Sequence, residues 1–264
     1  MARRSPAIER CVAVLNHLAA KPDERYTLSE LARDLELNKA TAHAMLATLV
    51  DEQYVMRDPD TLAYSLGPAL IAVGTAARAT YPAARLAEAP MAALSEDLQL
   101  TCLASQAIGD EIVILATSGT AKPLGINIQA GQRMPLSPPL GSVFVAWAGD
   151  SRIDAWLANL GSKATEGDFA RYRRALDLVR ARGYSLGVGG TDDYDLTELS
   201  DERAYRVNHV GAPVFNARGE VVLALFLIGF QGQITAAEVP AYAKRLLAAA
   251  GEVTAALGGR PPIG

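Results

Sequence analysis

In the N-terminal part of the chain, apolar residues recur every three or four positions, which predicts a series of short amphipathic helices. The first helix should begin at Ser5-Pro6, an N-cap followed by a proline at the first helical position. Its predicted buried face comprises Ile8, Cys11, Val12, Leu15 and Leu18. At that spacing Cys11 is interpreted as a small core residue, with a redox sensor as the alternative.

Two further helices joined by a tight turn are predicted next. Thr27 and Glu30 have the spacing of a capping box, in which hydroxyl and carboxylate satisfy each other's backbone amides. Asn38 can cap the second helix, expected over about 39–52, which buries Met45, Leu46, Leu49 and Val50. This order is that of a helix-turn-helix, whose second helix enters the DNA major groove. Two such helices also occur in many all-α domains, so the spacing alone leaves both interpretations open.

The segment after these helices favours DNA binding. Residues 54–58 and 62–66 form short alternating runs, and the turn-forming cluster Pro59-Asp60-Thr61 separates them. A hairpin directly after the second helix is a wing, which commonly lies beside a phosphate backbone. The combination predicts a winged helix-turn-helix.

Residues 68–80 are expected to form a helix that is apolar nearly all round, so it should pack on a partner chain or a neighbouring domain. From about Tyr81 the pattern mixes helices and strands. Helices are predicted over 82–98, 143–148, 150–160, 169–182 and 236–257, and strands over 101–108, 111–117, 124–128, 206–215 and 220–230, with another opening at Gly183-Tyr184 and a loop over 132–142. Strand pairs that flank a block of helices indicate an α+β domain with an antiparallel sheet.

Composition and charge limit the class of protein. The chain has 264 residues, half of them hydrophobic and a fifth charged, which suits one large or two modest globular domains. Its two cysteines, Cys11 and Cys102, fall in different predicted domains, so a disulfide framework is not expected. No apolar run suits a membrane span, and the start MARRSPAIER lacks the apolar core of a signal peptide. We expect a cytoplasmic protein without membrane contact.

The predicted DNA-binding part is not basic. Residues 1–65 contain eight Lys or Arg against ten Asp or Glu, and the whole chain has a net charge of −4. Because Lys and Arg contacts to phosphates supply much of the affinity for DNA, we expect modest affinity per protomer. Tight operator binding would then need two or more protomers on repeated half-sites.

Ser5 to Leu66 resembles the DNA-binding domain of the IclR (isocitrate lyase regulator) family of bacterial transcription factors. The similar motifs are AIERCVAVLNHLA, TLSELARDLELNKATAHAMLATLVDEQYV and RDPDTLAYSLGPALIAVG, and ARGYSLG, APVFNARGEVV and the terminal helix resemble the family's effector domain more loosely. The resemblance implies a winged helix-turn-helix at 5–66, a linker helix at 67–80 and a GAF-like effector-binding domain at 81–258. It also implies double-stranded operator DNA and a small-molecule effector as partners, and a homodimer or dimer of dimers.

Candidate DNA contacts follow from the predicted helix-turn-helix. They are Thr27, Asn38, Lys39, Ala40, Thr41, His43 and Arg57, with Thr27 and Arg57 near phosphates and Ala40 able to pack on a thymine methyl. For His43 the alternative is a neutral, half-buried side chain bonded to the backbone. Many family members have Arg where this chain has Ala44, so an operator sequence cannot be carried over from relatives.

Catalytic and metal motifs are absent from the sequence: no HExxH, CxxC, GxGxxG or P-loop spacing occurs. The Gly-rich segment 187–190 is interpreted as a flexible loop rather than a phosphate cradle. The acidic residues between Asp192 and Glu202 are interpreted as a solvated surface rather than a cation site. Ser137 and Ser142 lack the elbow and base that a nucleophile needs. We therefore expect no enzyme activity, no metal and no cofactor.

A ligand pocket is expected between the sheet and the segment SPPLGS, where the resemblance places the effector. The candidate lining is Pro139, Leu140, Gly187, His209, Phe226 and Ile228. Apolar residues stand where relatives that bind small acids have polar ones, which suggests an aromatic or otherwise hydrophobic effector with His209 as its polar anchor. The alternative is that these residues only fill a core. The leading hypothesis is a ligand-responsive repressor. The alternative is a metabolite-binding protein or enzyme whose helix-turn-helix docks another protein.

Overall fold

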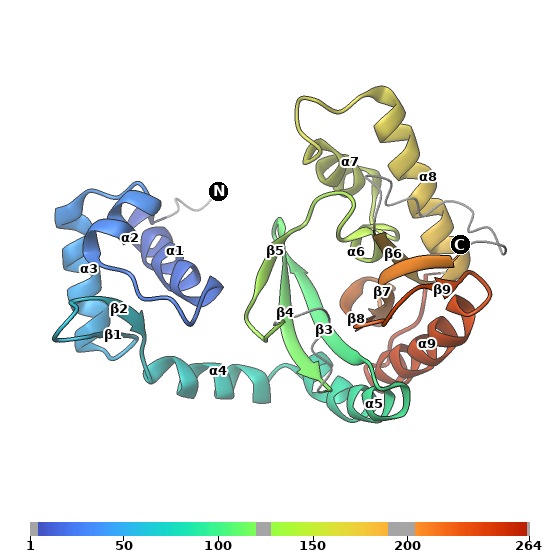
Figure 1. The fold of residues 1–264 in the computed structure, drawn as a ribbon, viewed down its shortest axis with the longest axis horizontal. Helices are drawn as coiled ribbons and strands as arrows, with labels where there is room; N and C mark the ends of the chain where they lie inside the picture. The colour runs from blue at the N-terminus through green and yellow to red at the C-terminus, as the bar shows by residue number, and fades with distance from the viewer. Residues whose placement is uncertain (1–4, 120–127, 190–203, 263–264) are drawn as a thin grey trace. The chain divides into compact units, whose positions relative to one another are not determined.

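The computed structural model describes residues 5–119, 128–189 and 204–262, and the chain forms two compact units, 1–80 and 81–264 (Figure 1). The first unit contains the helices α1 (Pro6–Ala20), α2 (Leu28–Asp34) and α3 (Lys39–Asp51). The antiparallel strands β1 (Val55–Arg57) and β2 (Tyr64–Leu66) follow, and then α4 (Ala69–Ala79). The predicted helix-turn-helix with its wing is confirmed.

The core of the first unit joins all of these elements except α4. Val14 and Leu18 of α1, Leu31 of α2 and Leu46 of α3 are at most 2% exposed, and Val55 and Tyr64 of the wing complete the cluster. The predicted inner face of α1 was wrong in part, because Ile8 is 65% and Val12 is 49% exposed. At about 100° per residue, Ile8 and Val12 point roughly 100° and 140° away from the mean direction of Val14 and Leu18.

The second unit is an antiparallel sheet covered on both faces by helices. Its described strands follow the order β5 (Arg133–Pro135), β4 (Glu111–Ser118), β3 (Thr101–Ile108), β8 (Val221–Ile228), β7 (Ala204–Phe215) and β6 (Ser185–Gly189), with β9 (Ile234–Thr235) paired to β7. The helices α5 (Pro82–Leu98) and α9 (Val239–Ala256) pack on one face. The helices α6 (Ser142–Val145), α7 (Asp150–Ala158) and α8 (Glu166–Arg182) contribute to the cluster on the other. The predicted α+β class is confirmed.

Alternation along β8 separates the two faces. Leu223, Leu225 and Leu227 are fully buried in the cluster with α5 and α9. Ala224 and Phe226 belong to the opposite cluster, which contains Phe144 of α6. Successive side chains of a strand point to opposite faces. The register with β8 therefore shows to which face of the sheet each side chain of a neighbouring strand points.

Several predicted boundaries need correction, and the predicted helices at 143–148 and 236–257 are Ser142–Val145 and Val239–Ala256. Residues 132–142 were predicted as loop, but Arg133–Pro135 pairs with Glu111–Val113 as the edge strand β5. The helix predicted at 169–182 begins at Glu166, because Thr165 and Asp168 form a capping box. The short strand β9 was not predicted. The strand predicted at 124–128 lies outside the described residues apart from Ile128, and so does the acidic run after Gly190.

The capping box of α8 makes a measurable contribution to the stability of the second unit. The Thr165 hydroxyl accepts from the Asp168 amide, and the Asp168 carboxylate accepts from the Thr165 amide at 2.9 Å. We expect Thr165→Ala to lower the free energy of unfolding by about 1 kcal/mol. Thr165→Ser keeps the hydroxyl and should stay close to the wild type in the same denaturant titrations. Equal losses in the two variants would contradict this role for the hydroxyl.

Candidate functional site

The start of α3 presents a solvent-facing surface. The Asn38 side chain caps the helix by accepting from the Ala40 amide at 2.8 Å. Lys39, Ala40 and His43 are exposed and Thr41 is half-buried. Ala42 and Leu46 of the same helix are fully buried. Three of the four predicted contact residues at the start of α3 are therefore open to solvent, and the half-buried alternative for His43 was wrong.

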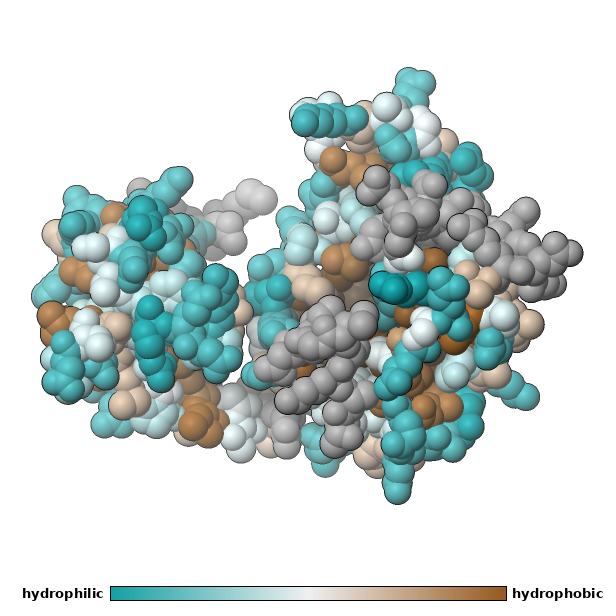
Figure 2. Space-filling view, in the orientation of Figure 1, coloured by the Kyte–Doolittle hydropathy of each residue, from teal (hydrophilic) through white to brown (hydrophobic). Residues whose placement is uncertain are grey.

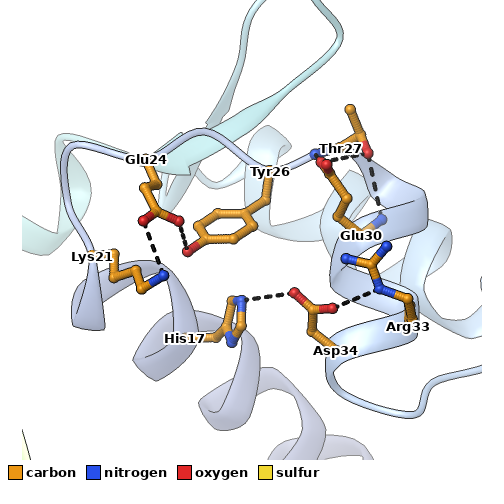
Figure 3. Close-up of polar contacts among 8 residues, drawn as sticks. All are labelled: His17, Lys21, Glu24, Tyr26, Thr27, Glu30, Arg33 and Asp34. Atoms are coloured by element: carbon orange, nitrogen blue, oxygen red, sulfur yellow. Dashed lines mark hydrogen bonds and ion pairs between the residues drawn. The ribbon is translucent and has the colours of Figure 1, made fainter.

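The helix α2 supports this surface through its capping box (Figure 3). The Thr27 amide donates to the Glu30 carboxylate at 2.8 Å, and the Thr27 hydroxyl donates to the same oxygen at 2.8 Å. The Glu30 amide donates back to that hydroxyl at 3.4 Å. Hydrogen bonds to the carboxylate hold the pKa of Glu30 below its ordinary value. A phosphate at Thr27 would have to compete with this carboxylate for the hydroxyl proton.

A second set of contacts fixes α1 against the segment that leads into α2 (Figure 3). The His17 ring packs edge-on against Tyr26 at 4.8 Å between centroids, and its Nε2 lies 3.6 Å from Asp34 of α2. The Tyr26 hydroxyl donates to Glu24 at 2.7 Å, which raises the pKa of Tyr26 to about 12. The supporting scaffold is thus polar at its edge and apolar at its centre.

The wing carries one predicted DNA contact, Arg57, close to two acidic residues. Arg57 is exposed and its guanidinium lies 5.6 Å from the centroid of the Tyr64 ring. Asp58 accepts from the amides of Asp60 and Thr61, at 3.0 and 2.7 Å, which shapes the turn. The bonds from Thr61 hold the pKa of Asp58 below its ordinary value, so it is ionised at neutral pH. Arg57 therefore acts beside two carboxylates.

In the second unit, the sheet face toward α6 brings candidate effector residues together. Across the strands His209 pairs with Gly187 on one side and with Ile228 on the other. The His209 ring occupies the space beside Gly187, where an added Cβ would lie 2.3 Å from it. That ring also meets Phe226 edge-on at 5.5 Å between centroids. The glycine at this position is therefore required by the histidine ring.

The loop before α6 faces the same cluster. Leu140 packs in the cluster that contains Phe144 and Phe226, whose ring centroids are 6.3 Å apart. The Leu140 carbonyl accepts from the Trp156 indole at 2.8 Å, which ties the loop to α7. Pro139 precedes it, is half-buried, and follows Pro138 through a cis peptide bond.

One polar side chain on this face was missed by the sequence analysis. Ser105 of β3 is 1% exposed and stands opposite Ala224, so it points to the same face as Phe226. Its hydroxyl has no hydrogen-bond partner among the described residues. A buried hydroxyl of this kind is rare and calls for an explanation. The alternation of Leu103, Ser105 and Ala107 against the core residues Cys102 and Ala104 was the signal that could have identified it.

Comparison with known proteins decides the family. Residues 7–59 match the IclR helix-turn-helix domain, and residues 79–255 match the C-terminal domain of the bacterial transcriptional regulator IclR. The chain belongs to the IclR family. The glycerol operon regulatory protein of Streptomyces coelicolor is 30% identical over 198 residues, which cover 72% of this chain and 76% of that protein.

Solved structures of IclR-family proteins have the same fold. A regulator from Alicyclobacillus acidocaldarius superposes with a TM-score of 0.79 at 27% identity, covering 97% of this chain and 100% of that one. An IclR homologue from Microbacterium hydrocarbonoxydans, complexed with 4-hydroxybenzoate, gives a TM-score of 0.71 at 20% identity, covering 96% of this chain and 99% of that one.

This IclR-family protein is therefore a DNA-binding transcriptional regulator with a C-terminal effector-binding domain, and not an enzyme. DNA binding belongs to the helix-turn-helix and small-molecule binding to the second unit. Among the described residues, no helix has the length and apolar character needed to cross a membrane.

The pH dependence of the unfolding free energy tests whether the His209 ring is enclosed in the folded protein. The residue keeps some exposed surface, but its ring is enclosed between Gly187 and Phe226, and burial lowers its pKa to about 4. Below pH about 6.5 the unfolded chain then binds a proton that the folded chain does not, so stability falls as the pH drops toward 4. Between pH 7.5 and 5 we expect His209→Gln to lose up to about 2 kcal/mol less unfolding free energy than the wild type. Parallel losses in the two proteins would contradict the enclosure of the ring.

Proposed function

We propose that this protein is a repressor that reads operator DNA through the N-terminal half of α3. In this proposal Lys39, Ala40, Thr41 and His43 face the major groove, Asn38 fixes the helix start, and Thr27 and Arg57 approach phosphates. The observation that carries it is the exposure of Lys39, Ala40 and His43 in the first two turns of α3, while Ala42 and Leu46 hold the helix in the core. The functional division proposed is a DNA-binding domain at 5–66, a linker at 67–80 and an effector-binding domain at 81–258.

Charge supports an oligomer as the DNA-binding form. The proposed contacts of one protomer include two cations, Lys39 and Arg57, and the second stands beside Asp58 and Asp60. So few phosphate contacts give weak binding, which repetition on two half-sites would strengthen. The linker α4 exposes Ile71 at 71% and Val73 at 50%, and hydrophobic atoms lie over α4 on the surface (Figure 2). Covering them with a second copy supports a homodimer or a dimer of dimers.

The proposed effector is mainly apolar and carries an uncharged polar group. Leu140, Phe226 and Ile228 supply apolar surface, and polar groups on the same face include the neutral imidazole of His209 and the free hydroxyl of Ser105. Like the hydroxyls of Thr101 and Ser185, which the strand register places on the same face, neither offers a positive charge to a carboxylate. The homologue complexed with 4-hydroxybenzoate shares the fold, which supports an aromatic ligand as compatible with it. Effector binding would favour one arrangement of the protomers and so change the spacing of paired α3 helices.

Lys39→Glu and Thr41→Ala test the proposed DNA-reading face. In gel shifts on DNA upstream of the protein's own gene, Lys39→Glu should weaken binding at least about tenfold and Thr41→Ala should weaken it less. Lys163→Glu, an exposed residue before α8, makes the same charge change in the other unit and should bind like the wild type. Binding by Lys39→Glu at wild-type strength would show that the face of α3 is wrongly assigned.

Thermal-shift screening tests the effector class. Uncharged aromatic and fatty compounds should stabilise the second unit, whereas pyruvate and glyoxylate should not. Ser105→Ala removes a hydroxyl that has no partner in the part of the chain that the structure describes. It should therefore leave the melting temperature of the free protein unchanged or higher while weakening the best ligand about tenfold. Stabilisation by small acids alone would refute the apolar site. If Ser105→Ala bound the ligand like the wild type, only the proposed role of the Ser105 hydroxyl would be contradicted.

A further inference from the structure

A groove of about 760 Å³ lies in the second unit, on residues that none of the preceding assignments uses. It runs between the segment after α6, the C-terminal end of α8, the helix α9 and the C-terminal tail. Arg180 and Gly183 line it from the end of α8, and Arg260, Pro261 and Pro262 line it from the tail. Its lining includes Trp147, Arg180, Phe215, Gly251 and Arg260. A volume of this size falls within the range of small-molecule sites.

Aromatic side chains and a tethered tail build the groove. The Trp147 ring meets Phe215 edge-on, with 5.3 Å between the ring centroids. The tail is held in place by backbone hydrogen bonds, from the Gly259 amide to Thr254 at 2.8 Å and from the Arg260 amide to Asn216 at 3.3 Å. Two aromatic rings and a rim held by hydrogen bonds form a surface on which the aromatic or aliphatic part of a ligand can pack.

The groove is separate from the proposed effector face. Phe215 lies six residues along β7 from His209, which corresponds to roughly 20 Å of extended strand. Phe144 packs near Phe226, whereas Trp147, three residues later, packs on Phe215. The two sites therefore use opposite ends of the same strand and successive aromatic residues around α6.

The charged side chains in the described lining of the groove are all positive. Its described lining contains Arg180 and Arg260 and no carboxylate. Arg180 is engaged, since it forms an ion pair with Asp177 at 2.5 Å and donates to the Ala146 carbonyl. Arg260 is exposed, and its side chain has no ion-pair partner among the described residues. A guanidinium at the rim favours an anionic group beside an apolar floor.

We propose that this groove is a second ligand site, which binds a small organic anion with an aromatic or aliphatic body. The body packs against Trp147 and Phe215, and the anionic group lies toward Arg260. The site differs from the proposed effector site both in place and in ligand charge, because a guanidinium replaces the neutral groups of the sheet face. The inference stands independently of DNA binding.

A pair of fluorescent probes tests the proposal on the full chain. Anilinonaphthalene sulfonate carries an anionic group on an aromatic body, and phenyl-naphthylamine is its uncharged counterpart. Gly251→Leu fills the groove, since a Cβ added at Gly251 meets no described atom within 4 Å. Its control is Gly167→Leu near the start of α8, where an added Cβ makes only an ordinary contact at 3.5 Å. Arg260→Ala removes the proposed anion contact, and Arg218→Ala, which removes a neighbouring arginine paired with Glu220, is its control.

We expect Gly251→Leu to weaken both probes at least about tenfold, and Arg260→Ala to weaken the sulfonate about threefold to fivefold with little effect on the uncharged probe. The two controls should bind both probes like the wild type. Unchanged binding of both probes in Gly251→Leu would overturn the proposal. The probes would then bind outside the groove, for example at the sheet face that contains Phe226, which this substitution does not reach. A change of oligomeric state in Gly251→Leu, measured by sedimentation, would also overturn it and assign the groove to contact between copies of the chain.

Discussion

The burial of one side of α3 determines what the first unit can present to DNA. Ala42 and Leu46 are fully buried against a core that includes Val14, Leu31 and Tyr64. Because side chains repeat every 3.6 residues, this burial turns Ala40 and Ala44 outward, and Lys39 and His43 are exposed in the first two turns of the helix. The capping box fixes the start of α2, and the Asn38 cap fixes the start of α3 directly after the turn. The proposed specificity of the regulator rests on this packing.

The balance of acidic and basic residues in the first unit is unusual for a DNA-binding domain. Acids outnumber bases over residues 1–65, and the wing turn is held together by an ionised aspartate. Such a unit gains little from non-specific attraction to phosphates, so discrimination between DNA sequences has to come from shape, base contacts and the spacing of protomers. An effector-binding domain that alters this spacing then has a large effect on occupancy, because the binding of each protomer alone is weak.

Local signals in the sequence predicted the local structure well. The Thr27–Glu30 capping box, the Asn38 cap and the wing turn each depend on residues within four positions of one another, and the structure has all three. Features set by distant partners were harder to predict. The strand β5 exists because three residues pair with the edge of β4. The exposure of Ile8 and Val12 depends on where α1 meets the rest of its core.

The same distinction applies to the candidate sites. His209 and Gly187 were predicted from the sequence, but the fit of the His209 ring against Gly187 across β6 and β7 is visible only in the register of the sheet. Ser105 was missed, since an isolated serine in a strand carries no motif. The groove beside Trp147 combines residues more than 100 positions apart, which periodicity cannot bring together.

Photo-crosslinking from the exposed side of α3 tests the central claim most directly. A photoreactive amino acid at Ala44, which is exposed one position after His43, should crosslink to bases of operator DNA. The same group at Ala20, at the exposed end of α1, should give little crosslinking to bases. Crosslinks from Ala20 with none from Ala44, in protein that still shifts the operator, would contradict the assignment of α3 as the element that reads DNA.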